Sequence, residues 1–209
     1  NLLYINNGDL TFTEDAKERG LDDMNRTIHA TFFDYDNDGD LDVYNLNSPD
    51  FKKKEEEIID LVGVQSDPRT FEAKGYDKLF RNDGNGFFTD VSAEVGILPD
   101  VGFGLNAQVS DINGDGWLDI YVCYAGLFPD DRRANEMYVN NGDGTFSDRS
   151  VEMGLDQKGY STQAAFYDHD LDGDLDMFLL NHSVNHDGNY APREDFLGTY
   201  DSLAGQRMY

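Results

Sequence analysis

The chain has 209 residues, of which 39% are hydrophobic and 13% aromatic, and this is enough apolar material for one sizeable core. Its 42 acidic residues outnumber 16 basic ones and give a formal net charge of −26, which argues against nucleic acid and anionic membranes as partners and favours cations. The sequence has no run of about 18 apolar residues, so we expect no membrane span.

The predicted elements follow one order, and the chain repeats this order three times. Each repeat opens with two short apolar strands separated by Asn, Asp and Gly, a hairpin whose turn needs positive φ. A short helical turn that ends at a glycine follows, at "DAKERG", "SAEVG" and "SVEMG". The three hairpin segments are "LYINNGDLTF" (3–12), "LFRNDGNGFF" (79–88) and "MYVNNGDGTF" (137–146).

Each repeat continues with a strand, an aspartate-rich loop and another strand. The strand before the loop has one buried face, as in "ATFFD" (30–34), and the strand after it is more continuously apolar, as expected for a strand covered on both faces. Cys123 lies in such a strand; we expect it to be buried, and as the only cysteine it allows no internal disulfide. Four short strands in each repeat predict an all-β fold built from β-propeller blades of four antiparallel strands.

Two insertions lengthen the repeats, at about 47–77 and 181–206. The first contains "DFKKKEEEIIDLVGV", which can form a helix with Lys52–Glu56 and Lys53–Glu57 pairs. Both insertions leave the repeat at the same point, so we expect them on the same face of the assembly, where binding loops of repeat folds usually lie. The alternative is that they only cover a blade.

The aspartate-rich loops share the pattern D-x-[DN]-x-D-G-x-x-D. Hard cations such as Ca²⁺ take roughly six to eight oxygen ligands, which requires several carboxylates on a sharply turning backbone. We expect side-chain oxygens from positions 1, 3, 5 and 9, a turn at the glycine of position 6, and the main-chain oxygen of position 7, which varies between Asp and Trp. The predicted metal ligands are Asp34, Asp36, Asp38, Asp40 and Asp42; Asp111, Asn113, Asp115, Trp117 and Asp119; and Asp168, Asp170, Asp172, Asp174 and Asp176.

Other interpretations of these loops fit the sequence less well. A single such loop could be a solvated acidic turn, but three copies at one phase of a repeat favour metal binding. EF-hands are excluded because position 12 is Asn45, Val122 or Leu179 rather than Glu. Mg²⁺ prefers to keep waters, and transition metals prefer His or Cys, of which the loops offer only His169, at a position between ligands. We therefore expect about three Ca²⁺ ions, one in each loop.

These repeats resemble the FG-GAP/VCBS repeat, the blade of integrin-α-type β-propellers. The segment "GFGLNAQVSDINGDGWLDIYV" (102–122) looks like that family's Phe-Gly opening and calcium loop, and "NNGDGTF" with "DYDNDGDLD" is similar to bacterial proteins of the VCBS and ASPIC/UnbV type. Only Phe103-Gly104 has the literal Phe-Gly; the corresponding pairs are Arg26-Thr27 and Tyr160-Ser161.

The resemblance implies a seven- or eight-bladed ring with loop calcium on one face. Because three repeats do not close such a ring, we expect 1–209 to be a partial propeller. The resemblance also implies an extracellular or bacterial cell-surface location, secreted or outer-membrane associated. Its implied role is adhesion or scaffolding, with a protein, a glycan or other subunits of a surface complex as partner.

Two classes of function stay open at this point. One is a noncatalytic, calcium-binding adhesion or scaffold module. The other is a calcium-dependent carbohydrate-active enzyme such as a polysaccharide lyase, for which Arg132, Arg133 and His186 are candidate groups to neutralise a uronate and abstract its proton. The sequence contains no nucleophile elbow, phosphate loop or zinc motif. Further candidates are His182 with His186 as metal ligands or as acid and base, and Tyr190, Phe196, Tyr200 and Trp117 as stacking platforms for sugars.

Overall fold

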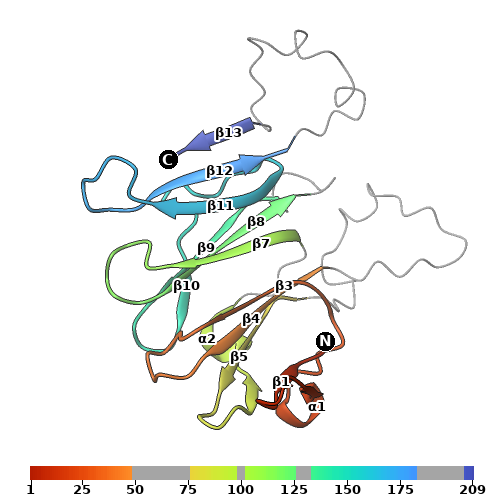
Figure 1. Cartoon of the computed structure of the whole chain (residues 1–209). Helices are drawn as coiled ribbons and strands as arrows, with labels where there is room; N and C mark the ends of the chain where they lie inside the picture. Colours follow the sequence, from red (N-terminus) through yellow and green to blue (C-terminus); the bar gives the residue numbers. More distant parts are fainter. Residues whose placement is uncertain (49–75, 98–101, 126–132, 183–204) are drawn as a thin grey trace, which may run out of the picture. The chain divides into compact units, whose positions relative to one another are not determined.

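The computed structural model describes residues 1–48, 76–97, 102–125, 133–182 and 205–209, and these residues form an all-β structure (Figure 1). They contain thirteen strands and two helices of one turn each. The elements are β1 (Tyr4–Asn6), β2 (Phe12–Glu14), α1 (Ala16–Arg19), β3 (Arg26–Phe33), β4 (Asp42–Ser48), β5 (Lys78–Asn82), β6 (Phe88–Asp90), α2 (Ser92–Val95), β7 (Phe103–Ser110), β8 (Asp119–Ala125), β9 (Glu136–Asn140), β10 (Phe146–Asp148), β11 (Ser161–Tyr167), β12 (Asp176–Asn181) and β13 (Gly205–Met208).

The chain divides into two compact units. One comprises Asn1–Val101 and Asn140–Ser147, and the other comprises Gly102–Val139 and Asp148–Tyr209. The described residues form four sheets, ordered β1-β2, β3-β4-β5-β6, β10-β9-β8-β7 and β11-β12-β13. Every pair with a known register is antiparallel. None of the helices in the described part of the chain is long and apolar enough to cross a membrane.

The four-stranded sheets do not coincide with the sequence repeats. Each repeat does supply four strands, as predicted, but β3 and β4 come from the first repeat whereas β5 and β6 are the opening hairpin of the second. The hairpin pairs with the strand that precedes it in the chain, with Val43 opposite Phe80. The β10-β9-β8-β7 sheet likewise joins β7 and β8 to the hairpin of the third repeat. A sheet therefore begins half a repeat later than the sequence motif does.

The positions that correspond to Phe-Gly share a backbone irregularity. The register of the first strand shifts between Thr27 and His29, between Gly104 and Asn106, and between Ser161 and Gln163. Each shift leaves one residue of the first strand without an opposite partner, as in a β-bulge. The bulge occurs in all three strands, so it does not depend on the literal Phe-Gly pair.

The turns of the hairpins have the predicted positive φ. Gly86 and Gly144 have φ values of 74° and 84°, and in the first hairpin the same position is Leu10, at 70°. Two of the three predicted helical turns form, as α1 and α2. The third prediction was wrong: residues 150–154 form only a turn, with one helix-like hydrogen bond of 3.0 Å from Met153 N to Arg149 O.

Each unit has its own apolar core. In the first unit, Val43 and Phe80 pack against Ala16 and Leu21. In the second unit a larger cluster joins the two sheets, and it contains Tyr121, Cys123, Met137, Val139, Leu155, Ala164, Met177 and Leu179. Every residue of β4 and β8 is buried, which confirms the prediction of a strand covered on both faces in two of the three repeats, and Cys123 is buried as expected. The prediction was wrong for β12, where buried and partly buried residues alternate and Leu180 is exposed.

Candidate metal centres

All three acidic loops connect the first two strands of a sheet. Residues 34–42 link β3 to β4, residues 111–119 link β7 to β8, and residues 168–176 link β11 to β12 (Figure 1). In each case the aspartate at position 9 is the first residue of the second strand, so its backbone belongs to the rigid sheet. The loops are thus short connections that are fixed at both ends by antiparallel pairing.

Two positions of each loop have left-handed backbone conformation. Position 6 is Gly39, Gly116 or Gly173, with φ of 96°, 93° and 103°, as the sequence predicted. Position 4 is left-handed as well, and sequence reasoning missed it. Its residues are Asn37, Gly114 and Leu171, with φ of 58°, 72° and 63°. Asn and Gly tolerate this conformation, and that choice of residues in two of the three loops was the available signal.

The carboxylate at position 1 organises the turn. Asp111 accepts hydrogen bonds from the backbone N–H of Asp115 at 3.0 Å and of Gly116 at 2.9 Å. Asp34 and Asp168 make the same pair of bonds to positions 5 and 6 of their loops, at 3.0–3.2 Å. The carboxylate at position 5 accepts the N–H of position 7 in each loop. These bonds curl the backbone of every loop, and in the first and third loops three ligand atoms lie close together.

The carboxylate at position 9 closes the loop from the strand. Asp42 and Asp119 are buried, and each accepts the N–H of position 2, from Tyr35 at 3.0 Å and from Ile112 at 2.9 Å. Asp42 also accepts the backbone N–H of Asn82 at 2.8 Å. Burial raises the pKa of Asp42 to about 6, because the ionised carboxylate is removed from water.

The first loop gathers three carboxylates around one point. One oxygen from each of Asp34, Asp36 and Asp42 lies within 4.8 Å of the others. Asp36 Oδ1 is buried and has no hydrogen-bond partner, and burial, with the charges of Asp38 and Asp34, raises the pKa of Asp36. A buried carboxylate oxygen without a donor is costly unless a cation neutralises it. The donor set, entirely oxygen, fits a hard divalent ion.

In the second loop Asn113 takes the place of an acid. Its amide oxygen accepts the N–H of Asp115 at 3.0 Å, and its amide nitrogen donates to Asp115 Oδ2 at 2.8 Å. The side chain of Trp117 at position 7 is partly buried, and its backbone N–H donates to Asp115 at 2.9 Å. This loop therefore has the same frame as the others with less negative charge.

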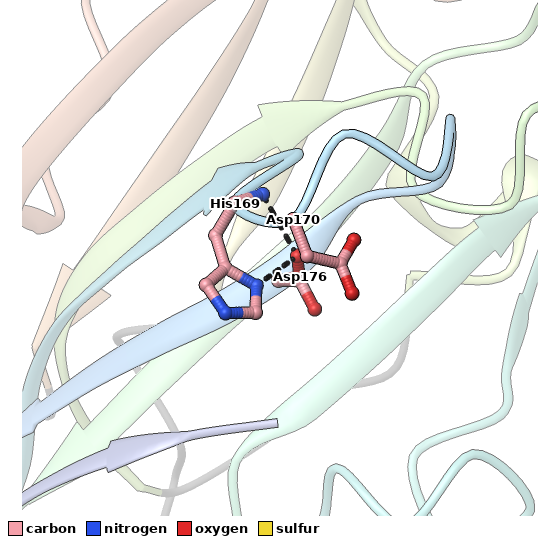
Figure 2. Close-up of side chains that lie close together, drawn as sticks. All are labelled: His169, Asp170 and Asp176. Atoms are coloured by element: carbon pink, nitrogen blue, oxygen red, sulfur yellow. Dashed lines mark hydrogen bonds and ion pairs between the residues drawn. The ribbon is translucent and has the colours of Figure 1, made fainter.

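The third loop contains two overlapping groups of ligand atoms. One comprises Asp168, Asp170 and Asp172, and the other comprises His169, Asp170 and Asp176 (Figure 2). His169 Nδ1 lies 2.7 Å from Asp176 Oδ2, which also accepts the backbone N–H of His169 at 2.9 Å. This contact raises the pKa of His169, and the same two hydrogen bonds, the backbone one first, lower the pKa of Asp176.

His169 lies nearer to the predicted ligands than its sequence position between them indicated. Position 2 was placed between the ligands, and the loop frame does direct its backbone N–H to position 9. The imidazole follows the N–H because the side chain is short enough to fold back on the same carboxylate oxygen (Figure 2). Tyr35, at the same position of the first loop, is buried instead and packs against Phe146 with 6.1 Å between ring centroids.

Two asparagines support the first loop and were not found by sequence reasoning. Asn82 binds Asp42 through its backbone N–H, and its side-chain Oδ1 accepts the N–H groups of Gly84 and Gly86 at 3.2 and 3.0 Å. Asn140 donates from Nδ2 to the Tyr35 carbonyl at 2.8 Å. Both end the first strand of a hairpin, and the recurrence of Asn at this position in each repeat was the available signal.

The other candidates for chemistry fall in two groups. Arg133 is buried, donates to the Tyr160 hydroxyl at 3.1 Å and lies over the Tyr160 ring at 4.6 Å, and this ring is also 5.6 Å from that of His182. Most of both insertions, with the helix expected in the first, lies outside the described residues. So do Arg132, His186, Tyr190, Phe196 and Tyr200.

With this geometry established, comparison with known proteins identifies the family. The profile of the FG-GAP-like repeat matches residues 57–122 and 123–179, together more than half of the chain. The chain therefore belongs to the FG-GAP-like repeat family, as its motifs indicated.

The other comparisons are less close. No curated protein matches the chain. Among solved structures, a similar one is an Agrocybe aegerita lectin, described by its specific recognition of non-reducing terminal N-acetylglucosamine. Identity is 20%, the TM-score is 0.40, and the match covers 86% of this chain. The chain spans 40% of the length of that lectin chain.

Proposed function

We propose that this chain is the calcium-binding part of a β-propeller that acts as a noncatalytic binding module. The observation that carries the proposal is the first acidic loop, where Asp36 Oδ1 is buried without a hydrogen-bond donor beside Asp34 and Asp42. A cation with oxygen ligands would neutralise these carboxylates, and Asp36 and Asp42 already have pKa values raised by burial.

In this proposal each loop holds one Ca²⁺ ion. Positions 1, 3, 5 and 9 supply side-chain oxygens and position 7 supplies its carbonyl, so that Asp40, Trp117 and Asp174 act through the main chain. The three loops keep one backbone frame although their charge differs, and this frame is what a repeated site requires. Bound calcium acts mainly on stability, because a site that forms only in the folded state adds its binding free energy to folding.

The whole assembly in this proposal is a ring of seven or eight blades. Four-stranded antiparallel sheets and membership of the FG-GAP-like family support blades of this kind. The ring would lie outside the cytoplasm, secreted or on a cell surface, and would bind a protein or a glycan through loops on one face. A net charge of −26 suits an environment that contains millimolar calcium.

Calcium titration of the full chain tests the metal sites. The protein is stripped with a chelator, dialysed, and titrated with CaCl₂ in a calorimeter, and its melting temperature is measured with and without calcium. We expect about three binding events and a melting temperature raised by several degrees. A melting curve unchanged by calcium, with no heat of binding, would refute the calcium sites.

A matched pair of variants shows whether the loop itself binds the ion. Asp36→Ala removes a predicted side-chain ligand, whereas Asp40→Ala removes an equal charge from the same loop and keeps the position-7 carbonyl. We expect the first to abolish one calcium event and the second to weaken it only slightly. Equal loss in both variants would mean that net charge, and not coordination, holds the ion.

Ligand binding is tested separately. The calcium-loaded chain is presented to immobilised glycans and acidic polysaccharides, with absorbance of unsaturated products followed in parallel. Retention that chelator abolishes, without product formation, supports a binding module. A steady rise in ultraviolet absorbance with an acidic polysaccharide would instead show that the chain is a lyase.

A further inference from the structure

We propose that the third acidic loop also forms a transition-metal site, in which His169 Nδ1 and the carboxylates of Asp170 and Asp176 bind Zn²⁺. Asp170 and Asp176 are also ligands of the calcium site proposed for that loop. The inference therefore rests on the proposed function only where it concerns competition between the two ions. The zinc site itself depends on the three side chains alone.

The donor set distinguishes this loop from the other two. The ligand atoms of His169, Asp170 and Asp176 all lie within 4.8 Å of one another, and Figure 2 shows the imidazole and the two carboxylates gathered at the mouth of the loop. At the same position the first loop has Tyr35, which is buried, and the second has Ile112, which offers no donor atom. A nitrogen donor beside two carboxylates suits zinc, whereas calcium prefers oxygen alone.

The three ligand atoms are close enough for a small tetrahedral ion to bind between them after small movements. Zinc binds nitrogen and oxygen at roughly 2.0–2.2 Å, which places neighbouring ligand atoms about 3.3 Å apart. His169 Nδ1 and Asp176 Oδ2 are 2.7 Å apart, so a small outward movement of each admits the ion. Zinc then takes the place of any proton shared by this pair, and that proton goes to solvent. Water fills the remaining coordination position.

The imidazole is oriented before any ion arrives. The rings of Tyr167 and His169 lie edge to face, at 89° with 6.5 Å between centroids, and the backbone N–H of His169 is fixed on Asp176 at 2.9 Å. The His169 side chain is 49% exposed, so an ion reaches it from solvent without any rearrangement of the core. An oriented and accessible nitrogen reduces the ordering cost of binding.

Metal titration of the stripped full chain tests the site. Co²⁺ reports nitrogen ligation through its visible absorption, and Zn²⁺ affinity follows from competition with a chromophoric chelator. The test variant is His169→Ile, which installs the residue of the second loop. The control is His182→Gln, which removes another histidine of the same unit and leaves the loop intact.

We expect the native chain and the His182→Gln variant to bind one Zn²⁺ with the same affinity and to show the Co²⁺ bands. In His169→Ile the bands should vanish and zinc affinity should fall at least tenfold, while the calcium stoichiometry stays the same. Unchanged zinc binding in His169→Ile, or a loss only in His182→Gln, would overturn the inference.

The result also separates this inference from the calcium proposal. Zinc binding that depends on His169 in a chain that binds no calcium would uphold the zinc site and refute the calcium sites. Calcium binding together with a zinc affinity that is the same with and without His169 would uphold the calcium sites and refute the zinc site.

Discussion

The Tyr44 hydroxyl donates a 2.7 Å hydrogen bond to Asp77 Oδ2 in the interior of the β3-β4-β5-β6 sheet. The other oxygen of Asp77 accepts the backbone N–H of Asn47, also at 2.7 Å. The β10-β9-β8-β7 sheet has the same arrangement with an amide in place of the carboxylate. Asn135 accepts the N–H of Tyr124 and donates to the Tyr121 hydroxyl, both at 2.9 Å. An Asx residue just before the third strand therefore ties that strand to the second one.

Removing this acceptor should destabilise the fold strongly. In Asp77→Ala the buried Tyr44 hydroxyl and Asn47 N–H lose the carboxylate that accepts their hydrogen bonds, and we expect the free energy of unfolding to fall by about 3 kcal/mol. Asp77→Asn copies the second sheet and should cost roughly 1 kcal/mol. Urea denaturation in calcium measures both, with the exposed Asp22→Ala as control. A loss in Asp77→Ala no larger than that in the control would contradict the account.

Leu10 offers a stabilising substitution. It is 97% exposed at φ 70°, where the other hairpins carry Gly86 and Gly144. Leu10→Gly relieves the left-handed strain and removes an exposed apolar side chain, so we expect a gain of about 1 kcal/mol. Met24→Gly, at a residue that is 94% exposed and has ordinary φ, should lose up to about 1 kcal/mol through chain entropy. Thermal melts compare the two, and the same sign in both would show that strain at Leu10 is unimportant.

The position-1 aspartates should matter even without metal. Asp111 uses both carboxylate oxygens for the N–H groups of Asp115 and Gly116, so Asp111→Asn sets an NH₂ donor against one of them. We expect a loss of about 1–3 kcal/mol in the presence of chelator. Asp174→Asn is the control at position 7, where the Asp172 carboxylate raises the pKa of Asp174 and loss of charge relieves repulsion. Asp111→Asn as stable as the native chain in chelator would mean that the position serves only the ion.

The thiol of Cys123 should be unreactive in the folded protein and react only after unfolding. Burial raises the pKa of its thiol to about 12, so at pH 8 almost no thiolate is present in the folded state. We expect no reaction with an aromatic disulfide reagent in calcium, and one equivalent in denaturant. A Val151→Cys variant, at a residue that is 78% exposed, supplies a fast-reacting thiol for comparison. Stoichiometric labelling of Cys123 in the native protein would contradict its place in the core.

The sequence predicted those features that depend on residue type at a fixed position in the repeat. The glycines at position 6 predicted positive φ, and the apolar runs after the loops predicted strands covered on both faces, which holds for β4 and β8 but not for β12. Sheet boundaries could not be predicted in this way, because a repeat has no inherent starting point. Only the pairing of Val43 with Phe80 assigns the hairpin to the sheet before it.

Side-chain direction within the loops was the second limit. The pattern placed His169 between ligands, and nothing in the spacing reveals that its ring folds back onto Asp176. Leu10 and Leu171 were missed for a related reason, since leucine gives no sign that its backbone is left-handed. Asp77 was missed because it stands at the end of an insertion, where no motif draws attention to it.

Sheets that straddle the repeats carry a consequence for how the molecule denatures. Because β5 and β6 from the second repeat complete the sheet begun by β3 and β4, melting of one repeat removes half of the sheet before it. Local unfolding of one repeat therefore also destabilises the sheet that precedes it in the chain. Deletion of a single motif truncates two neighbouring sheets. An excised fragment that keeps a whole sheet must be cut before Arg26 or Phe103, and not at the start of the motif.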